Sequence, residues 1–239
     1  VLCGNGFQAY LFESLRTTPE LSFAVRELNC AGGIMITASH NPPEYNGYKV
    51  YGEDGGQIVP RFAEKIIQEI DRVRDLSSVA YMEEEEARRQ GLLHIIGEEI
   101  DRIYIERVKN LAFRKELIRQ VGKDLRIVYT PLHGTGTMPV RRVLKELGFQ
   151  EVMIVPEQEK PDPDFSTVRS PNPEDPKAFE LALKLAEEAG ADIVVATDPD
   201  CDRVGAIVWD KEKNPRLLTG NQTGALLMDY ILSTMQEQK

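Results

Sequence analysis

Apolar and polar positions alternate along the first part of the chain in a way that predicts strands and helices in turn. Residues 7–12 (F-Q-A-Y-L-F) predict a strand, residues 19–28 a helix with apolar side chains at helical spacing, and residues 33–38 a second strand. Together they predict an opening β-α-β unit. A short strand at residues 48–51 follows, and then a helix that begins at Pro60 with its apolar side chains on one face.

A polar stretch separates this region from a second alternating one. Residues 71–97 carry an acidic run and predict a solvated, partly helical connection, and residues 98–120 follow with a helical pattern. Because strands alternate with helices on both sides of the connection, we expect two similar α/β domains and the beginning of a third. The later strands are predicted at residues 126–130, 151–155, 192–197 and 205–209, and the later helices at residues 138–147, 177–189 and 225–235.

Composition excludes several classes of protein. The chain has 239 residues, 41% of them hydrophobic and 28% charged, which is typical of one or two globular domains. A net charge of −10 argues against a nucleic-acid-binding surface, and it requires local positive groups or a metal ion to attract an anionic substrate.

Cysteine usage and the absence of long apolar runs predict a cytoplasmic protein. The three cysteines are odd in number and widely spaced, which indicates a reducing compartment. No apolar run approaches the ~20 residues that span a bilayer, so we expect no membrane partner. The first residues lack Met and lack the basic segment of a signal peptide, which predicts that the sequence comes from the middle of a longer chain.

A serine and a histidine follow directly after the strand predicted at residues 33–38. Ser39 and His40 precede Asn41 and two prolines, which cannot continue a strand. Binding and catalytic groups often collect in loops of this kind. Ser, Asn and Pro are also the ordinary residues of turns, so this stretch by itself leaves a plain turn as the alternative.

Three alternating aspartates follow another predicted strand. Asp198, Asp200 and Asp202 would repel one another strongly without a cation or bound protons among them, and their oxygen atoms suit Mg²⁺ or Ca²⁺. An EF-hand is excluded, because it needs Gly and Glu where this sequence has Arg203 and Trp209. A guanidinium beside a divalent ion favours a bound phosphate. The alternative is a polar turn that binds nothing.

Residues 129–136 (Y-T-P-L-H-G-T-G) form a third candidate, a loop between a strand and a helix. Its glycines would let main-chain N–H groups approach an anion, with help from the helix dipole. Many such loops contain two glycines, so a purely structural loop fits equally well, and the spacing matches neither nucleotide-binding fingerprint.

Four motifs occur in order along the chain: T-A-S-H-N-P at residues 37–42, N-G-Y-K at residues 46–49, T-P-L-H-G-T-G at residues 130–136 and D-P-D-C-D-R at residues 198–203. Taken together, they resemble the α-D-phosphohexomutase family, which includes phosphoglucomutases and phosphomannomutases. The run S-L-R-T-T-P-E-L-S-F-A-V-R before the serine is most similar to the bacterial phosphoglucomutase branch.

The resemblance implies tandem three-layer α/β/α domains with mixed sheets. Residues 1–110 would form most of the first domain, residues 111–215 the second, and residues 216–239 the beginning of a third. The family's N-terminal arginine-bearing segment, its sugar-reading loop and its phosphate-binding fourth domain have no counterpart in the sequence.

The resemblance also implies a role for each candidate residue. Ser39 would be the phosphorylated residue, and Mg²⁺ would be held by Asp198, Asp200 and Asp202 and would also contact the phosphorylated Ser39. His40 and Lys49 would lie beside the transferring group, as proton-transfer or charge-stabilising residues, and Arg203 would lie near the phosphoserine.

The implied activity is that of an isomerase, an intramolecular phosphotransferase. It would interconvert hexose 1-phosphate and hexose 6-phosphate, with glucose the first expectation over mannose or pentose, through a phosphoserine and a sugar bisphosphate. Two alternatives remain at this point. One is an aspartyl-phosphate phosphatase with Asp198 as its nucleophile, and the other is a Mg²⁺-binding module without turnover.

Overall fold

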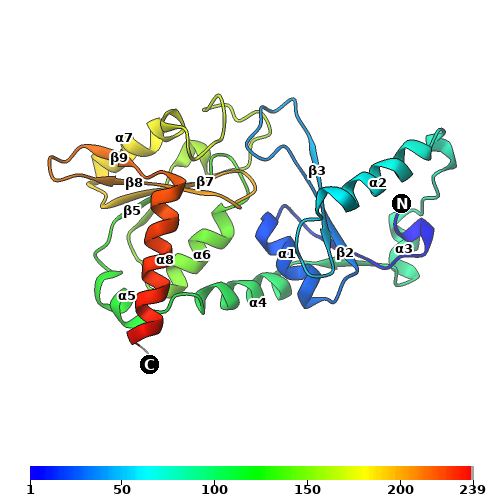
Figure 1. The fold of residues 1–239 in the computed structure, drawn as a ribbon, viewed down its shortest axis with the longest axis horizontal. Helices are drawn as coiled ribbons and strands as arrows, with labels where there is room; N and C mark the ends of the chain where they lie inside the picture. Colours follow the sequence, from blue (N-terminus) through cyan, green and yellow to red (C-terminus); the bar gives the residue numbers. More distant parts are fainter. Residues whose placement is uncertain (238–239) are drawn as a thin grey trace. The chain divides into compact units, whose positions relative to one another are not determined.

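The computed structural model describes residues 1–237, which fall into two compact units (Figure 1). The first unit consists of Val1–Arg16, Glu20–Met35 and Lys49–Ile103. The second consists of Thr17–Pro19, Ile36–Tyr48 and the chain from Tyr104 onward. Helices and mixed sheets occur together, which confirms the predicted α/β class.

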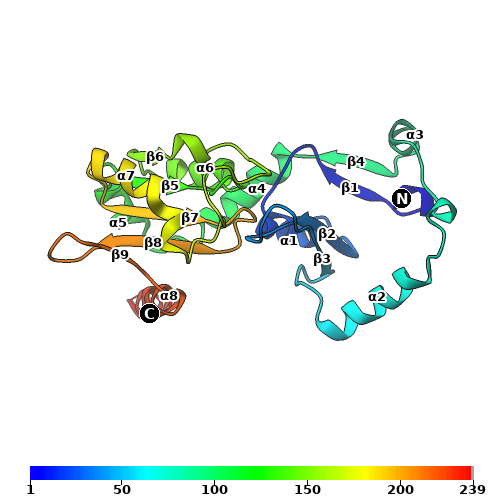
Figure 2. The same cartoon turned by 90° about the horizontal axis from the view of Figure 1, so that it is seen from above.

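The strands that precede α4 form two small sheets. β1 (Ala9–Phe12) pairs in parallel with β4 (Leu93–Ile96), and Figure 2 shows the two side by side. β2 (Gly32–Thr37) pairs with β3 (Gly47–Gly52). The pairing expected for the opening β-α-β unit is therefore wrong, because β1 takes β4 as its neighbour. The four residues of β4 lie inside the stretch predicted as a connection, and they are too few to show a periodic pattern.

The helices of the first unit begin close to the predicted positions. Ala24 of α1 packs with Ile96 of β4 and Ile100 of α4 in a small apolar core. α2 begins at Pro60 as expected, but no residue of this helix is buried. The elements are η1 (Cys3–Asn5), α1 (Thr18–Glu27), α2 (Pro60–Arg72), η2 (Leu76–Ser78), α3 (Glu84–Arg89) and α4 (Glu98–Lys109), the last of which continues into the second unit.

The helical pattern of residues 98–120 is broken into α4 and α5 (Lys115–Val121). Arg114 stands at the break. Its main-chain N–H donates to the Tyr230 hydroxyl at 3.0 Å, and its Nε donates to Thr234 Oγ1 at 3.0 Å. These contacts reach α8 (Gly220–Glu237), and such tertiary contacts override the local helical preference.

The second unit is built on a five-stranded sheet in the order β6-β5-β7-β8-β9. The first three strands are parallel to one another, and β8 and β9 are antiparallel additions. The connections from β5 to β6 and from β6 to β7 run in opposite directions along the sheet, so right-handed crossovers put α6 and α7 on opposite faces (Figure 1). The strands are β5 (Ile127–Thr130), β6 (Val152–Ile154), β7 (Ile193–Thr197), β8 (Val204–Trp209) and β9 (Pro215–Leu217), and the helical elements are α6 (Thr137–Leu147), η3 (Pro156–Gln158), η4 (Pro176–Phe179) and α7 (Glu180–Ala189).

This topology determines where a ligand site can form. Val128 and Val194, on the central strands β5 and β7, are fully buried against Phe179 and Ala182. The carboxyl ends of β5 and β7 meet where the direction of the crossovers changes, which is the usual position of ligand sites in open α/β sheets. Within residues 1–237, no helix is long and apolar enough to cross a membrane.

Candidate active site

The acidic loop begins at the carboxyl end of β7. Asp198 has no exposed surface, Asp200 is 4% exposed, and Asp202 is exposed. The loop turns tightly, since the Cys201 N–H donates to the Asp198 carbonyl at 2.9 Å and Cys201 adopts a φ of 56°. A non-glycine residue in this left-handed region is uncommon, and such residues are frequent at functional sites.

Asp198 is only partly satisfied by its surroundings. Its Oδ1 accepts hydrogen bonds at 3.1 Å from the main-chain N–H groups of Asp202 and Arg203. Its Oδ2 lies 3.5 Å from Arg203 Nε. Among residues 1–237, this Oδ2 and Arg203 Nη2 are buried side-chain atoms that have no hydrogen-bond partner. A buried carboxylate oxygen in this state suits a cation, and a buried guanidinium nitrogen suits an anion.

The pKa of Asp198 also fits a cation beside the acidic loop. Burial, and after it the charge of Asp202, raises the pKa of the Asp198 carboxyl to about 6, although the main-chain N–H of Arg203 acts in the opposite sense. A divalent cation beside these carboxylates would favour their charged forms.

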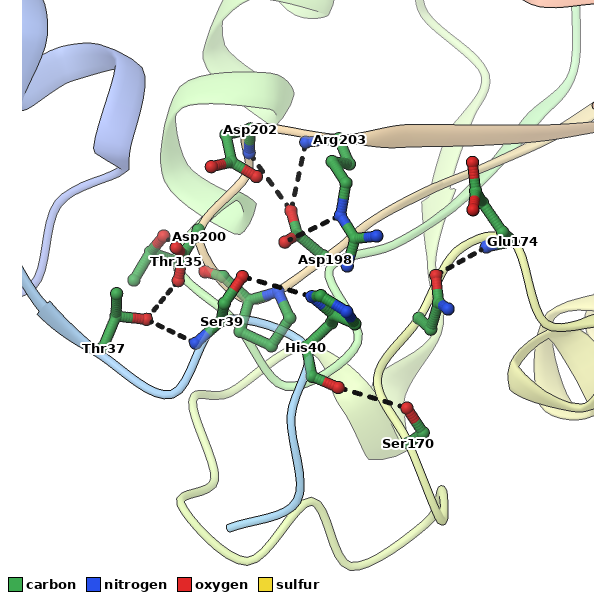
Figure 3. A network of polar contacts seen from close by, with 12 residues as sticks. Thr37, Ser39, His40, Thr135, Ser170, Glu174, Asp198, Asp200, Asp202 and Arg203 are labelled. Atoms are coloured by element: carbon green, nitrogen blue, oxygen red, sulfur yellow. Dashed lines mark hydrogen bonds and ion pairs between the residues drawn. The ribbon is translucent and has the colours of Figure 1, made fainter. Parts of the chain in front are cut away.

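The serine loop lies in the same unit as the acidic loop, and Figure 3 shows the contact between them. Thr37 Oγ1 accepts the Ser39 N–H at 2.8 Å and donates its own hydrogen to Asp200 Oδ1. Ser39 adopts a φ of 53°, and its Oγ lies 3.3 Å from His40 Nδ1. The hydroxyl of Ser39 is thus held beside an imidazole, on a loop hydrogen-bonded to the acidic loop.

The candidate residues are brought together to different degrees. Ser39, His40 and the three aspartates belong to the second unit, as does Arg203, whereas Lys49 lies on β3 in the first unit. In Figure 3, Asp198 faces Arg203 and Asp200 faces Thr37. Within the part of the chain that the structure describes, no three His, Cys, Asp or Glu side chains lie together as a preformed metal site.

The glycine-containing loop after β5 supports the acidic loop. A Cβ on Gly134 would lie 2.2 Å from Pro199 Cα, and a Cβ on Gly136 would lie 2.2 Å from the Tyr129 hydroxyl. The N–H of Gly134 donates within its own loop at 2.9 Å, and the N–H of Thr135 donates to the Pro199 carbonyl at 2.9 Å. The N–H groups of Gly134 and Thr135 are therefore already used inside the protein, and anion binding by the rest of this loop stays a prediction.

Three polar residues that the sequence pattern did not single out also contact the two loops. Thr18, at the start of α1, donates its N–H to the Asp200 carbonyl at 3.0 Å. Ser170 Oγ donates to the His40 carbonyl at 3.1 Å, and Thr37 bridges the two loops as described above. Only Thr37 had a local signal, since a Thr two residues before Ser39 can form a side-chain turn.

The chain is similar to phosphoglucomutases and phosphomannomutases. Residues 1–76 match the family model for alpha/beta/alpha domain I of phosphoglucomutase/phosphomannomutase, and residues 102–211 match that for domain II. The chain is 41% identical over 230 residues to a phosphoglucomutase of Staphylococcus epidermidis strain RP62A, which covers 96% of the chain and 41% of that relative. It is likewise 41% identical over 233 residues to a phosphoglucomutase of Staphylococcus aureus strain N315, covering 96% of the chain and 40% of the relative.

Solved structures agree on the fold. A crystal structure from Thermus thermophilus, assigned as a phosphomannomutase, is 30% identical with a TM-score of 0.68, covering 87% of this chain and 43% of that one. A phosphoglucomutase/phosphomannomutase family protein from Burkholderia thailandensis is 21% identical with a TM-score of 0.65, covering 92% of this chain and 43% of the other. The chain thus spans about two fifths of the length of the relatives it matches.

Proposed function

This chain belongs to the phosphoglucomutase/phosphomannomutase family, and we propose that it carries the phosphate-transfer site of a mutase. The reaction is the interconversion of hexose 1-phosphate and hexose 6-phosphate, and the phosphoglucomutase relatives favour glucose as the sugar. The observation that carries the proposal is the contact through Thr37, which joins the loop of Ser39 to an acidic loop suited to a cation.

The proposed phosphate carrier is Ser39. Ser39 is only half-buried, whereas Asp198 has no exposed surface and has Oδ1 occupied by two main-chain N–H groups. A carboxylate held in this way is poorly accessible to a substrate phosphate, which argues against the alternative in which Asp198 is the nucleophile.

The metal proposed for the site is Mg²⁺, with Asp198, Asp200, Asp202 and the phosphorylated Ser39 as its ligands. Support comes from the buried Asp198 Oδ2 without a hydrogen-bond donor among residues 1–237 and from an all-oxygen set of ligands. When bound, the ion would neutralise charge on the phosphate. Arg203 would add a guanidinium to that charge, and the buried Nη2 of this residue supports the role.

The reaction proceeds in two transfers. First, the bond between phosphorus and Ser39 Oγ breaks as a bond forms between phosphorus and the free hydroxyl oxygen of the sugar monophosphate, which loses its proton. The resulting bisphosphate then reorients in the site. A bond forms between Ser39 Oγ and the phosphorus at the other position, as the bond from that phosphorus to the sugar oxygen breaks and the oxygen takes up a proton. His40, whose Nδ1 lies 3.3 Å from Ser39 Oγ, and Lys49 are the proposed proton-transfer or charge-stabilising groups.

The same proposal also covers the domains, the partners and the location of the protein. Residues 1–110, 111–215 and 216–239 correspond to most of the first domain, the second domain and the beginning of the third, in line with the matched domains I and II. The partners are a sugar phosphate and a sugar bisphosphate, and the net charge of −10 disfavours nucleic acid. Three free cysteines among the described residues support a cytoplasmic location.

Phosphorylation of Ser39 is the decisive test. We expect incubation with glucose 1,6-bisphosphate and Mg²⁺ to add one phosphate to the 239-residue chain, and peptide mapping to locate it on Ser39. Ser39→Ala should abolish this addition. A phosphate that hydroxylamine removes would identify an acyl phosphate on Asp198 instead, and would overturn the assignment of the carrier.

A further inference from the structure

A buried polar network lies beneath the segment that follows β6, and the transfer reaction does not use it. Gln158 and Thr130 have no exposed surface, and His133 is 4% exposed. Thr130 Oγ1 donates to Gln158 Oε1 at 2.6 Å, and Thr130 Oγ1 itself accepts the Leu132 N–H at 3.1 Å. Burying polar groups is costly unless they are hydrogen-bonded, so these hydrogen bonds favour one arrangement of the segments that they join.

Thr167 is an exposed residue whose hydroxyl contacts both Gln158 and His133. Its Oγ1 accepts from Gln158 Nε2 at 2.9 Å and lies 2.8 Å from His133 Nε2. The Thr167 hydroxyl can donate to His133 Nε2 or accept from it, according to the tautomer of the ring. The other ring nitrogen, Nδ1, lies 3.8 Å from Asp162 Oδ2.

The backbone at this point is also unusual. Leu132 and His133 have φ values of 46° and 63°, so two consecutive non-glycine residues adopt the left-handed region. Strain of this kind persists only where the surrounding contacts impose it. The Gln158 carbonyl accepts the His133 N–H at 3.2 Å, which adds a further contact between the two segments.

The chain from Thr167 leads directly to the serine loop. Ser170 is three residues further on, and its Oγ donates to the His40 carbonyl at 3.1 Å (Figure 3). Beyond it, Pro171 and Pro173 are buried, and a Cβ on Gly205 of β8 would lie 2.1 Å from the Pro173 carbonyl oxygen. Ser170 is therefore held between two anchors, Thr167 on one side and Pro173 on the other.

We propose that Ser170 is a positioning residue, which holds the main chain of the serine loop so that Ser39 presents its hydroxyl for phosphate transfer. The network of Thr130, His133, Gln158 and Thr167 keeps Ser170 in place for this contact. The inference rests on the proposed function of Ser39, but the contact itself can be measured without any turnover.

Hydrogen exchange on the 239-residue chain tests the contact directly. The amides of Ser39 and Asn41 are hydrogen-bonded within residues 36–48, to Thr37 Oγ1 at 2.8 Å and to the Ala38 carbonyl at 3.1 Å. Ser170→Ala should speed their exchange by about three- to tenfold, the factor expected for loss of one hydrogen bond. Ser170→Thr keeps the hydroxyl and should restore slow exchange.

A second variant and a control separate this role from general destabilisation. Thr167→Val removes a hydroxyl from an exposed residue and should also speed exchange at residues 36–48. Ser78→Ala removes another hydroxyl that donates to a main-chain carbonyl, at 2.6 Å from Asp75 O in the first unit, and should leave that exchange unchanged.

The unaltered chain and the variants are then each incubated with glucose 1,6-bisphosphate, and phosphate addition to Ser39 is measured. We expect Ser170→Ala to slow phosphate addition to Ser39 by a similar factor. Unchanged exchange in Ser170→Ala overturns the proposal, and so does faster exchange with an unchanged rate of phosphorylation. If Ser39 of the unaltered chain takes no phosphate, the proposed function fails, while exchange still decides whether Ser170 holds the loop.

Discussion

Asp162 shows how a single side chain stabilises the segment that follows β6. Its Oδ2 accepts the Ser166 hydroxyl at 2.5 Å and the Ser166 N–H at 3.0 Å, and its Oδ1 accepts the Asp164 N–H at 3.0 Å. These hydrogen bonds, led by the Ser166 hydroxyl, lower the pKa of Asp162 to about 2. The Asp162 N–H donates in turn to the His133 carbonyl at 3.1 Å.

This shift predicts a specific dependence on pH. A carboxyl with a lowered folded-state pKa adds stability that is present above the unfolded value of 3.8 and is lost as the pH falls toward 2. In a carboxyl carbon NMR titration, Asp162 should titrate near 2, and Ser166→Ala should move the midpoint upward toward the ordinary value. Ser166→Thr retains the hydroxyl and should leave the midpoint low. A midpoint that Ser166→Ala does not move would show that the hydroxyl is not the cause.

At the scale of single residues, the sequence indicates candidate reactive groups more readily than the residues that contact their loops. Ser39, His40 and the aspartates stand out because their chemistry is unusual at the end of an apolar strand. Thr37 and Ser170 are ordinary loop residues, and their importance depends on contacts to Asp200 and His40. Those partners are far away in sequence, so no local pattern could reveal the contacts.

At the scale of elements, the loops after β5 and β7 depend on close main-chain approach. Gly134→Ala would place a methyl group 2.2 Å from Pro199 Cα, and backbone atoms cannot move aside as a flexible side chain could. We expect a loss of about 1–3 kcal/mol or more in the free energy of unfolding, measured by urea titration, together with weaker Mg²⁺ binding because the acidic loop is displaced.

A matched glycine provides the control. Gly224 lies in α8, and a Cβ there would meet no atom within 4 Å. Gly224→Ala should therefore increase stability by up to about 1 kcal/mol through helix propensity and leave Mg²⁺ binding unchanged. Equal effects of the two substitutions would contradict the role given to the loop after β5.

The secondary structure was predictable where a pattern was long enough. α6 and α7 end directly before Gly148 and Gly190, as expected, and β7 leads into the acidic loop. β4 was missed because four residues show no period, and its partner β1 lies more than eighty residues earlier in the chain. The break between α4 and α5 was missed because Arg114 is held by residues of α8.

At the scale of the whole molecule, the chain carries a net charge of −10 and spans about two fifths of the length of the relatives it matches. Both loops of the proposed site belong to the second unit, as residues 36–48 and the chain from Tyr104 onward. The proposed metal site can therefore be tested on the 239-residue chain, apart from any question of sugar turnover.

Mg²⁺ should raise the melting temperature of this chain. A ligand that binds only the folded state at ten times its Kd adds about 1.4 kcal/mol, which corresponds to about 3–6 °C for a protein of this size. Asp198→Asn keeps an oxygen to accept the two main-chain N–H groups but removes the charge that attracts the ion, so the shift should disappear. Asp229→Asn removes the same charge from an exposed position on α8 and should retain the full shift, as measured by calorimetry with and without Mg²⁺. A shift that survives in Asp198→Asn would place the ion at other ligands, and the phosphate chemistry proposed for Ser39 would then lose its metal.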